Sequence, residues 1–362
     1  MIPSRHGRNR FTALDGWRGI AACMVVLFHV RAPSHVSELA LVRNSFLFVD
    51  FFFVLSGFVI AATYAERLAG GLGIGRFMLL RFGRLFPLHL AVLAAFVGLE
   101  LMRNGALSPA DPLGALVPRL LLIHGLGPFD TEIWNVPSWS ISSEFFAYLL
   151  FALAVAAAGA RHERLLVGAA LVGAAILYAG AGKINAAGYE MVRCVYGFAI
   201  GAGAWHLFVR SREALPRGNL AEGLAIAAVV AFVSIAGENP WSIAAPLVFC
   251  AVVLVFASER GMSSRLLNSR PFLFLGAVSY SVYMVHLFVA HRVVEGLTFA
   301  QRLGLSLVAD KWAGDVLIAL CLMLVVAVAA LTYRFIEVPA REWFRRRAQA
   351  VREPGLLHTA SD

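Results

Sequence analysis

The class of fold follows from the stretch FTALDGWRGIAACMVVLFHV, residues 11–30. A helix that crosses the hydrocarbon core of a bilayer needs about 20 mostly apolar residues. We therefore expect a membrane-spanning helix over residues 13–31, with Arg18 near its start and His29 near its end. Ionisable side chains are costly within a bilayer and usually face the interior of a helical bundle, so both are candidates for a functional site.

The composition of the whole chain extends this reading. Of its 362 residues, 60% are hydrophobic and 15% are charged, whereas soluble domains carry about 25% charged residues. We expect an all-α, polytopic membrane bundle of about ten spans, and read residues 113–126 as a short interfacial or re-entrant helix. The expected spans are residues 13–31, 46–65, 82–102, 139–159, 164–182, 190–209, 220–237, 241–258, 275–296 and 314–335.

Positive charge sets the expected orientation. Arginines gather in alternate connections, starting with the basic N-terminal residues, and such segments usually lie in the cytoplasm. Both termini are therefore predicted inside, with a membrane domain over residues 10–345 and a disordered cytoplasmic tail over 346–362. The net charge of +9 flanks apolar runs instead of forming a basic domain with interleaved aromatic residues, so nucleic-acid binding is not expected.

Arg18 and His29 share one face of the first expected span. They are eleven residues apart, which is close to three helical turns and about 16 Å along the axis. Two structural explanations stay open: Arg18 could extend to the inner headgroups, and His29 could be a hydrogen-bonded core histidine. A shared face also fits a polar track that runs through the bundle.

A second cluster lies in RFMLLRFGRLFPLH, residues 76–89. Arg81 and Arg84 are three residues apart and share a helix face. Paired guanidinium groups bind phosphate well, although an arginine-rich flank on the inner side of a span is the simpler explanation.

The third cluster is NVPSWSISSEFFAYLLF, residues 135–151. Asn135 belongs to the long predicted outer loop over residues 103–138, and the next span begins near Trp139. Glu144 then lies about one turn inside the membrane, near the expected depth of His29. A carboxylate there could orient the imidazole or handle protons, or it could be a hydrogen-bonded packing group.

Three further polar residues interrupt apolar runs. Asp50 lies in LFVDFFFVLSGFVI, either as a site residue or as a buried brace, and Ser56-Gly57 in the same run permits close helix contact. Tyr283 and His286 are three residues apart in a later span, where His286 is a rival base or a structural hydrogen-bonding group. Neither HxxxH nor HExxH occurs, so no metal site is expected.

Together these residues favour transfer of an acyl group. A phosphate-rich donor could bind the arginines from inside, and a long thin arm could follow the polar track to His29. The imidazole could then remove a proton from an acceptor hydroxyl as it attacks a thioester. The same features would also serve an exporter of a small anion. A scaffold protein is a third interpretation, but it does not explain the matched depths that are expected for Arg18, His29 and Glu144.

At this point the chain resembles the acyltransferase 3 family of membrane-bound O-acyltransferases. The resemblance covers nearly the whole chain, and its motifs are specific in combination. The matching segments, in order, are FTALDGWRGIAACMVVLFHV, VDFFFVLSGFVI, RFGRLFP, WNVPSWSISSEFFAYLL, LGAVSYSVYMVH and YRFIEVP.

The resemblance implies a donor, an acceptor and a location. The donor would be acyl-coenzyme A, usually acetyl-coenzyme A, as a co-substrate with no permanently bound cofactor. The acceptor would be a hydroxyl of a surface or exported glycan, with a lipid or a macrolide-type metabolite as alternatives. The protein would lie in the bacterial cytoplasmic (inner) membrane, in contact with the lipid bilayer.

The same resemblance assigns roles to particular residues. His29 would be the catalytic base, Arg18 with Arg81 and Arg84 would bind the donor, and Glu144 would assist in the active site. One departure concerns the glutamate pair that the family often carries in this motif, because here Glu144 is followed by Phe145.

Overall fold

The computed structural model describes residues 11–30, 32–107, 111–127, 129, 132–303, 308 and 310–350. These residues form helices and no β-strand, which confirms the prediction of an all-α fold. The longer helices are α1 (Thr12–His29), α4 (Phe48–Ala69), α5 (Ile74–Asn104), α7 (Trp139–Ala158), α8 (His162–Ile176), α9 (Glu190–Ser211), α10 (Asn219–Ala236), α11 (Ala245–Phe256), α13 (Arg270–Arg302), α14 (Lys311–Thr332) and α15 (Val338–Ala350). The shorter ones are α2 (His35–Glu38), α3 (Ala40–Arg43), α6 (Pro112–Leu120) and α12 (Met262–Leu267).

Seven helical segments of the described chain are long and apolar enough to cross a membrane. Each of the ten expected ranges contains helix, but the count of ten is not reached. The helix α1 falls short because Asp15 and Arg18 lower its hydropathy, and the apolar segment Pro240–Phe256 is too short. The expected spans 139–159 and 164–182 lie within one counted segment, Val136–Ala181. The seven segments are Ser45–Ala69, Ile74–Asn104, Val136–Ala181, Glu190–Ser211, Asn219–Ala236, Arg270–Arg302 and Lys311–Ala350.

Several boundaries differ from the prediction, two of them at arginine-rich segments. The helix α5 begins at Ile74, eight residues before the expected start at residue 82, and continues through Pro87. At the C-terminus, α15 runs to Ala350, so residues 346–350 of the expected tail are helical. Residue 10 and residues 351–362 lie outside the described part of the chain.

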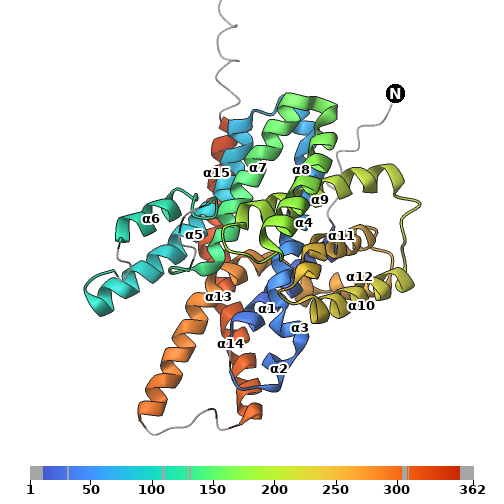
Figure 1. Cartoon of the computed structure of the whole chain (residues 1–362). Coiled ribbons are helices and arrows are strands. Elements are labelled where there is room, and N and C mark those ends of the chain that lie inside the picture. The colour runs from blue at the N-terminus through green and yellow to red at the C-terminus, as the bar shows by residue number, and fades with distance from the viewer. Residues whose placement is uncertain are drawn as a thin grey trace, which may run out of the picture.

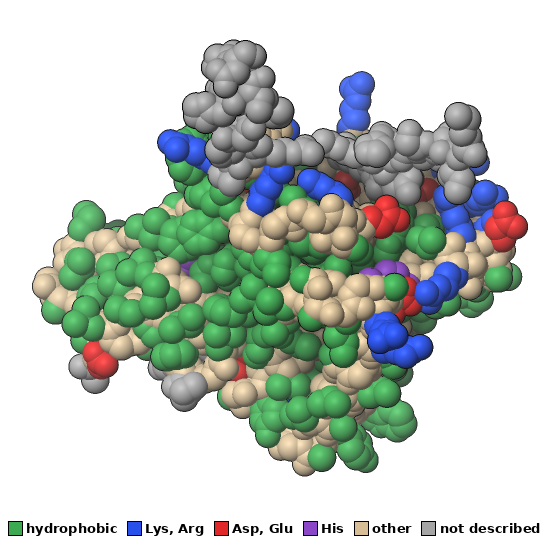
Figure 2. All heavy atoms as spheres, turned by 90° about the horizontal axis from the view of Figure 1, so that it is seen from above, with side chains coloured by type: hydrophobic (Ala, Val, Ile, Leu, Met, Phe, Trp, Pro, Cys, Tyr) green, Lys and Arg blue, Asp and Glu red, His purple; other side chains and the backbone are tan. Residues whose placement is uncertain are grey.

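The outer surface of the bundle is apolar. Large hydrophobic side chains are exposed along α7, α8, α10 and α14, and Leu171 of α8, for example, is 67% exposed. Figure 2 shows a face dominated by hydrophobic side chains, with lysines and arginines toward the upper and right-hand edges of the view. Contiguous exposed apolar surface of this kind indicates contact with lipid.

The helix α1 lies in the middle of the bundle, next to α13 (Figure 1). The helices α7, α8 and α9 stand together on one side of it, and α10, α11 and α12 form a second group. The helix α5 leads to the short α6, which lies to the side as the predicted short helix. This arrangement places both ends of α1 next to other helices that carry candidate site residues.

Glycines bring two pairs of helices into backbone contact. A Cβ atom on Gly57 of α4 would lie 2.0 Å from the Phe198 carbonyl oxygen of α9, and one on Gly201 would lie 1.8 Å from the Val54 carbonyl oxygen of α4. The close contact expected at Ser56-Gly57 is thereby confirmed. The helices α1 and α13 meet in the same way, since a Cβ atom on Gly276 would lie 2.1 Å from the Asp15 carbonyl oxygen.

This packing makes a prediction for α9. Gly201→Ala should lower the apparent melting temperature of the protein in detergent by several degrees, because the added methyl group must push α4 away and such overpacking typically costs ~1–3 kcal/mol. Gly203→Ala is the matched control on the same helix, since its Cβ atom meets nothing within 4 Å. The control should melt at or above the wild-type temperature; equal melting of both variants would contradict the contact.

Candidate active site

Three candidate arginines surround one cavity near the start of α1. The cavity has a volume of about 170 Å³ and is formed by α1, α4, α5, α7 and α13. We call it the arginine cavity. Its lining residues are Arg18, Val49, Phe52, Phe53, Leu55, Ser56, Val59, Ile60, Arg81, Arg84, Leu85, Ser140, Ile141, Glu144, Tyr148, Ser279, Tyr280 and Tyr283.

Aromatic rings hold the guanidinium group of Arg81. Its Nη2 donates to the Tyr64 hydroxyl at 2.9 Å, and its Cζ lies 4.9 Å from the centre of that ring. The Tyr148 ring centre is 5.9 Å away. Cation–π contacts and one hydrogen bond therefore orient a positive charge at the cavity wall, and Arg81 has no carboxylate partner among the described residues.

Arg84 is anchored by the last helical segment of the bundle. It forms an ion pair with Glu337, whose side chain is 2% exposed and also accepts a hydrogen bond from Ser281 at 2.8 Å. The Arg84 Cζ lies 5.2 Å from the centre of the Tyr280 ring. Among the described residues, Arg18 by contrast has a long contact with Asp15, at 3.5 Å. The predicted cluster of three arginines is thus brought together, with Arg84 the most constrained.

Glu144 lies in the arginine cavity and not in the cavity that His29 lines. Its Oε1 accepts a 2.5 Å hydrogen bond from the Tyr148 hydroxyl, which in turn contacts Ser56 Oγ at 3.0 Å. The expectation that Glu144 matches the depth of His29 is therefore wrong. The reason is that α7 begins inside the bundle, since Pro137 and Ser138 just before it are buried.

A second cavity, of about 780 Å³, lies at the other end of α1. We call it the histidine cavity. Its wall contains His29 from α1 together with aromatic and charged side chains from α5, α9 and α13. Its lining residues are Val25, Phe28, His29, Phe46, Val49, Phe96, Leu99, Glu100, Arg103, Asn104, Glu132, Trp134, Val136, Pro137, Trp139, Asn185, Arg193, Tyr283, Leu287, His291 and Arg292.

The hydrogen bonds of His29 and His286 define where their protons lie. His29 Nδ1 is 2.9 Å from the Val25 carbonyl oxygen, and His286 Nδ1 is 2.6 Å from the Tyr283 carbonyl oxygen. Carbonyl oxygens only accept, so both Nδ1 atoms carry hydrogen. His286 Nε2 then accepts from His29 Nδ1 at 3.2 Å. In this neutral form the lone pair of His29 is on Nε2, as a general base requires.

The candidate Asp50 belongs to a buried ion pair in the wall of the histidine cavity. Arg193 donates to its two carboxylate oxygens at 3.0 and 2.8 Å, and the two side chains are 0% and 2% exposed. Arg193 also donates to the Phe46 carbonyl oxygen and to Asn185. Sequence reasoning missed Arg193, although a carboxylate in an apolar run indicates a buried cationic partner.

The other two candidates come from the segment before α7. Asn135 is buried and donates to the Met284 carbonyl oxygen at 3.1 Å, which ties this segment to α13 next to His286. Trp139 lines the histidine cavity, and Arg193 lies 5.5 Å from its ring centre. Directly before Asn135, Trp134 adopts φ +55°, an unfavourable conformation for a bulky residue, and its Nε1 donates to Glu100 at 2.7 Å.

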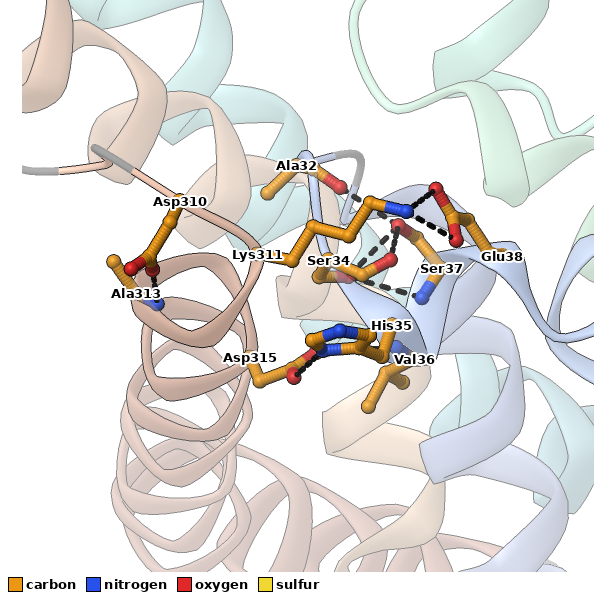
Figure 3. A network of polar contacts seen from close by, with 10 residues as sticks. All are labelled: Ala32, Ser34, His35, Val36, Ser37, Glu38, Asp310, Lys311, Ala313 and Asp315. Atoms are coloured by element: carbon orange, nitrogen blue, oxygen red, sulfur yellow. Dashed lines mark hydrogen bonds and ion pairs between the residues drawn. The ribbon is translucent and has the colours of Figure 1, made fainter.

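The chain beyond His29 is fastened to the beginning of α14 (Figure 3). Asp315 accepts from the Val36 backbone at 3.1 Å and contacts His35 Nδ1 at 2.7 Å. Lys311 pairs with Glu38 at 2.6 Å, and its hydrogen bond lowers the pKa of Glu38 below the ordinary value. This network fixes the exit from α1, so the end of the helix that carries His29 has a defined position.

The polar track expected between Arg18 and His29 is interrupted. Within the described residues, Val49 and Tyr283 are the two that line both the arginine cavity and the histidine cavity. Both side chains are buried. The arrangement is therefore two chambers, one cationic and one containing an imidazole pair, with a thin wall between them.

Comparison with known proteins finds one family and several relatives. The model of a family described as an acyltransferase domain matches residues 11–334. The putative membrane-bound transacylase BcsY of Komagataeibacter xylinus is 29% identical over 367 residues, covering 96% of this chain and 87% of the relative. Protein 2 in the picA locus of Rhizobium radiobacter is 34% identical over 166 residues, covering 40% of this chain and 81% of the relative.

A further relative is longer than this chain. The peptidoglycan O-acetyltransferase OatA of Listeria monocytogenes is 23% identical over 382 residues, and the alignment covers 94% of this chain but 57% of OatA. No solved structure matches the chain.

Proposed function

Because the chain belongs to the acyltransferase 3 family, we propose that it transfers an acyl group from acyl-coenzyme A, in the first place acetyl-coenzyme A, to a hydroxyl of a glycan. The observation that carries the proposal is the pair of chambers at the two ends of α1. One chamber holds a cluster of arginines, and the other holds an imidazole with a basic lone pair.

The arginine cavity is suited to the donor. Its volume of about 170 Å³ is below the ~300–1,000 Å³ of ordinary ligand pockets, so a thin pantetheine arm fits and a nucleotide does not. The phosphates would stay at the mouth, held by Arg18, Arg81 and Arg84. Within the cavity, Glu144 and the Tyr148 hydroxyl offer hydrogen bonds to the amides of the arm.

The chemical step would take place where the thioester reaches the histidine cavity. His29 Nε2 removes the proton of the acceptor hydroxyl, whose oxygen forms a bond to the thioester carbon. The carbon–sulfur bond breaks, and the coenzyme leaves as a thiol after taking up the proton from the imidazolium. His286 keeps the His29 ring in the required tautomer through its 3.2 Å hydrogen bond.

The larger histidine cavity is suited to a carbohydrate acceptor. The rings of Trp134 and Trp139 lie in its wall beside charged groups such as Glu100 and Arg292. Flat aromatic faces with hydrogen-bonding groups around them match the alternating apolar and hydroxyl surfaces of a sugar. The relative OatA is a peptidoglycan O-acetyltransferase, which supports a glycan over a lipid or a macrolide-type metabolite.

The proposed orientation follows the arginines. We place both termini in the cytoplasm of a bacterial cell and let the arginine cavity open toward that side, where acyl-coenzyme A is made. All ten expected ranges would then cross the inner membrane, including the shorter α1 and α11. An 18-residue helix such as α1 is about 27 Å long, close to the thickness of the hydrocarbon core.

The proposal is tested by labelled transfer. Full-length protein in membrane vesicles with the host's polysaccharide fraction should move label from radioactive acetyl-coenzyme A into an alkali-labile ester. Arg81→Ala should raise the KM for acetyl-coenzyme A about 10- to 100-fold, since a charged hydrogen bond contributes ~1.5–3 kcal/mol. Arg43→Ala is the matched control, because this exposed arginine lies outside both cavities.

Two results would count against the proposal. Label that never enters a saccharide, combined with ion-coupled flux of a small anion in proteoliposomes, would support the exporter. An unchanged KM in Arg81→Ala, with transfer intact, would move the donor site away from the arginine cavity.

A further inference from the structure

The wall between the two chambers is made by very few side chains. Val49 and Tyr283 are the residues common to both linings in the described chain, and they are 8% and 6% exposed. Tyr283 is the larger of the two, and it comes from α13, the same helix that supplies His286. The two chambers therefore adjoin at the Tyr283 ring and Val49.

The Tyr283 ring is held in place from several directions. Its hydroxyl donates to the Pro137 carbonyl oxygen at 3.1 Å and contacts Ser140 Oγ at 2.8 Å. The Phe52 ring of α4 lies edge-on, 5.8 Å between centres. The phenol of α13 thus bridges to Pro137 and Ser140 at the start of α7. Both hydrogen bonds are made by the hydroxyl oxygen, so the ring is released when the contacts of this one atom break.

The backbone of Tyr283 is linked to the proposed base, His29, through His286. The Tyr283 carbonyl oxygen lies 2.6 Å from His286 Nδ1, and His286 Nε2 lies 3.2 Å from His29 Nδ1. Rotation of the phenol breaks the hydrogen bonds of its hydroxyl and leaves this backbone contact in place. The wall can therefore open while His29 stays oriented.

Resting on the function proposed above, we propose that Tyr283 is the gate between donor and acceptor chambers. Closed, the phenol separates the thioester from the water of the larger chamber and keeps the bundle tight to ions. It moves aside when the donor arm enters, so that the thioester meets His29 only with the arm in the gap. Tyr283 is on this account a positioning residue, and its chief effect is the exclusion of water.

Loss of the gate should be detectable as one defined side reaction, hydrolysis of the thioester. With the wall open, a water oxygen bonds to the thioester carbon and the carbon–sulfur bond breaks. The sulfur leaves as a thiol after accepting a proton from the water, and the acyl group is released as a carboxylic acid. No further reactant is needed, so hydrolysis can be followed without any acceptor.

The test uses full-length protein in proteoliposomes with acetyl-coenzyme A as the probe. Tyr283→Ala should release free thiol about tenfold faster than wild type in the absence of acceptor, because water reaches the thioester. The same variant should pass protons into the vesicles, reported by a trapped pH dye. Tyr283→Phe keeps the ring but loses both hydroxyl contacts, and should raise thiol release about fivefold by opening more often.

A neighbouring tyrosine provides the matched control. Tyr280 is on the same helix and is buried, but it lines the arginine cavity alone. Tyr280→Ala enlarges the donor chamber and leaves the wall intact, so it should not let protons through. Melting curves confirm that each variant is folded, and Tyr283→Phe decides the question if Tyr283→Ala does not fold.

The two readouts separate the gate from the proposed function. Proton leakage in Tyr283→Ala, with no reaction of acetyl-coenzyme A in any variant, would support the gate and refute the donor. Normal transfer by wild type, with Tyr283→Ala or Tyr283→Phe tight to protons and no faster in hydrolysis, would refute the gate and leave the proposed function standing.

Discussion

His29→Ala should reduce transfer of label from acetyl-coenzyme A to the acceptor by at least ~10²-fold, and by as much as ~10⁴-fold, the range that general-base catalysis contributes. The imidazole is the proposed base, and alanine has no group that can replace it. Initial rates in membrane vesicles, at saturating donor, measure the loss as a fall in kcat.

A second histidine in the same cavity serves as the control for this substitution. His291 also lines the histidine cavity, yet it is exposed and lies near Arg292 and Glu295, and the hydrogen bond of the His29–His286 pair does not involve it. His291→Ala should change the rate by no more than a few-fold. Full transfer by His29→Ala, in a protein that remains inserted in the membrane, would remove His29 from the mechanism.

Asp50→Ala should be the most destabilising single change at the site, by about 3–5 kcal/mol, because it leaves the Arg193 guanidinium buried without its counter-charge. Both side chains are almost fully enclosed. Thermal unfolding in detergent should show a large fall in melting temperature. Lys183→Ala breaks an exposed ion pair with Glu238 and should have a small effect.

A double variant sharpens the interpretation. Asp50→Leu combined with Arg193→Met replaces the pair by apolar side chains of similar size, which is often neutral for stability. Most of the lost stability should therefore return. A double variant as unstable as Asp50→Ala would show that Arg193 acts through its bonds to Phe46 and Asn185 instead of through the ion pair.

The helices were predictable because apolar runs of this length have few alternatives. The expected spans and the observed helices agree closely at α1, α9 and α10. The largest shift is at α5, whose first two turns carry Arg76 and Arg81. Charged residues at a membrane boundary look like a connection in a hydropathy profile, yet they continue a helix as readily as apolar ones do.

The site was predictable where one helix determined the geometry. Arg18 and His29 share a helix, so their separation follows from the helical rise. Each lines a cavity, as expected for an ionisable side chain within a membrane-spanning helix. Glu144 was misplaced because its depth depends on where α7 begins within the bundle, and the buried 3-10 helix Val136–Ser138 lowers that start. Single-sequence periodicity carries no such tertiary information.

The partners of the buried charges could not be read from the sequence either. Arg193 and Asp50 are 143 residues apart, and Arg84 and Glu337 are 253 apart. An apolar run with one charge indicates that a partner exists, but several arginines could have supplied it. The partition at Tyr283 was equally hidden, since it depends on the meeting of α4, α7 and α13.

The helix α13 reaches both chambers. Its 33 residues span about 50 Å, and they form part of the wall at both ends, with Ser279 beside the arginines and Arg292 beside the imidazoles. On the function proposed above, donor and acceptor both contact this one helix, so we expect binding of the donor to alter the affinity for the acceptor. Thermodynamic linkage then requires the sugar to alter the affinity for coenzyme by the same factor.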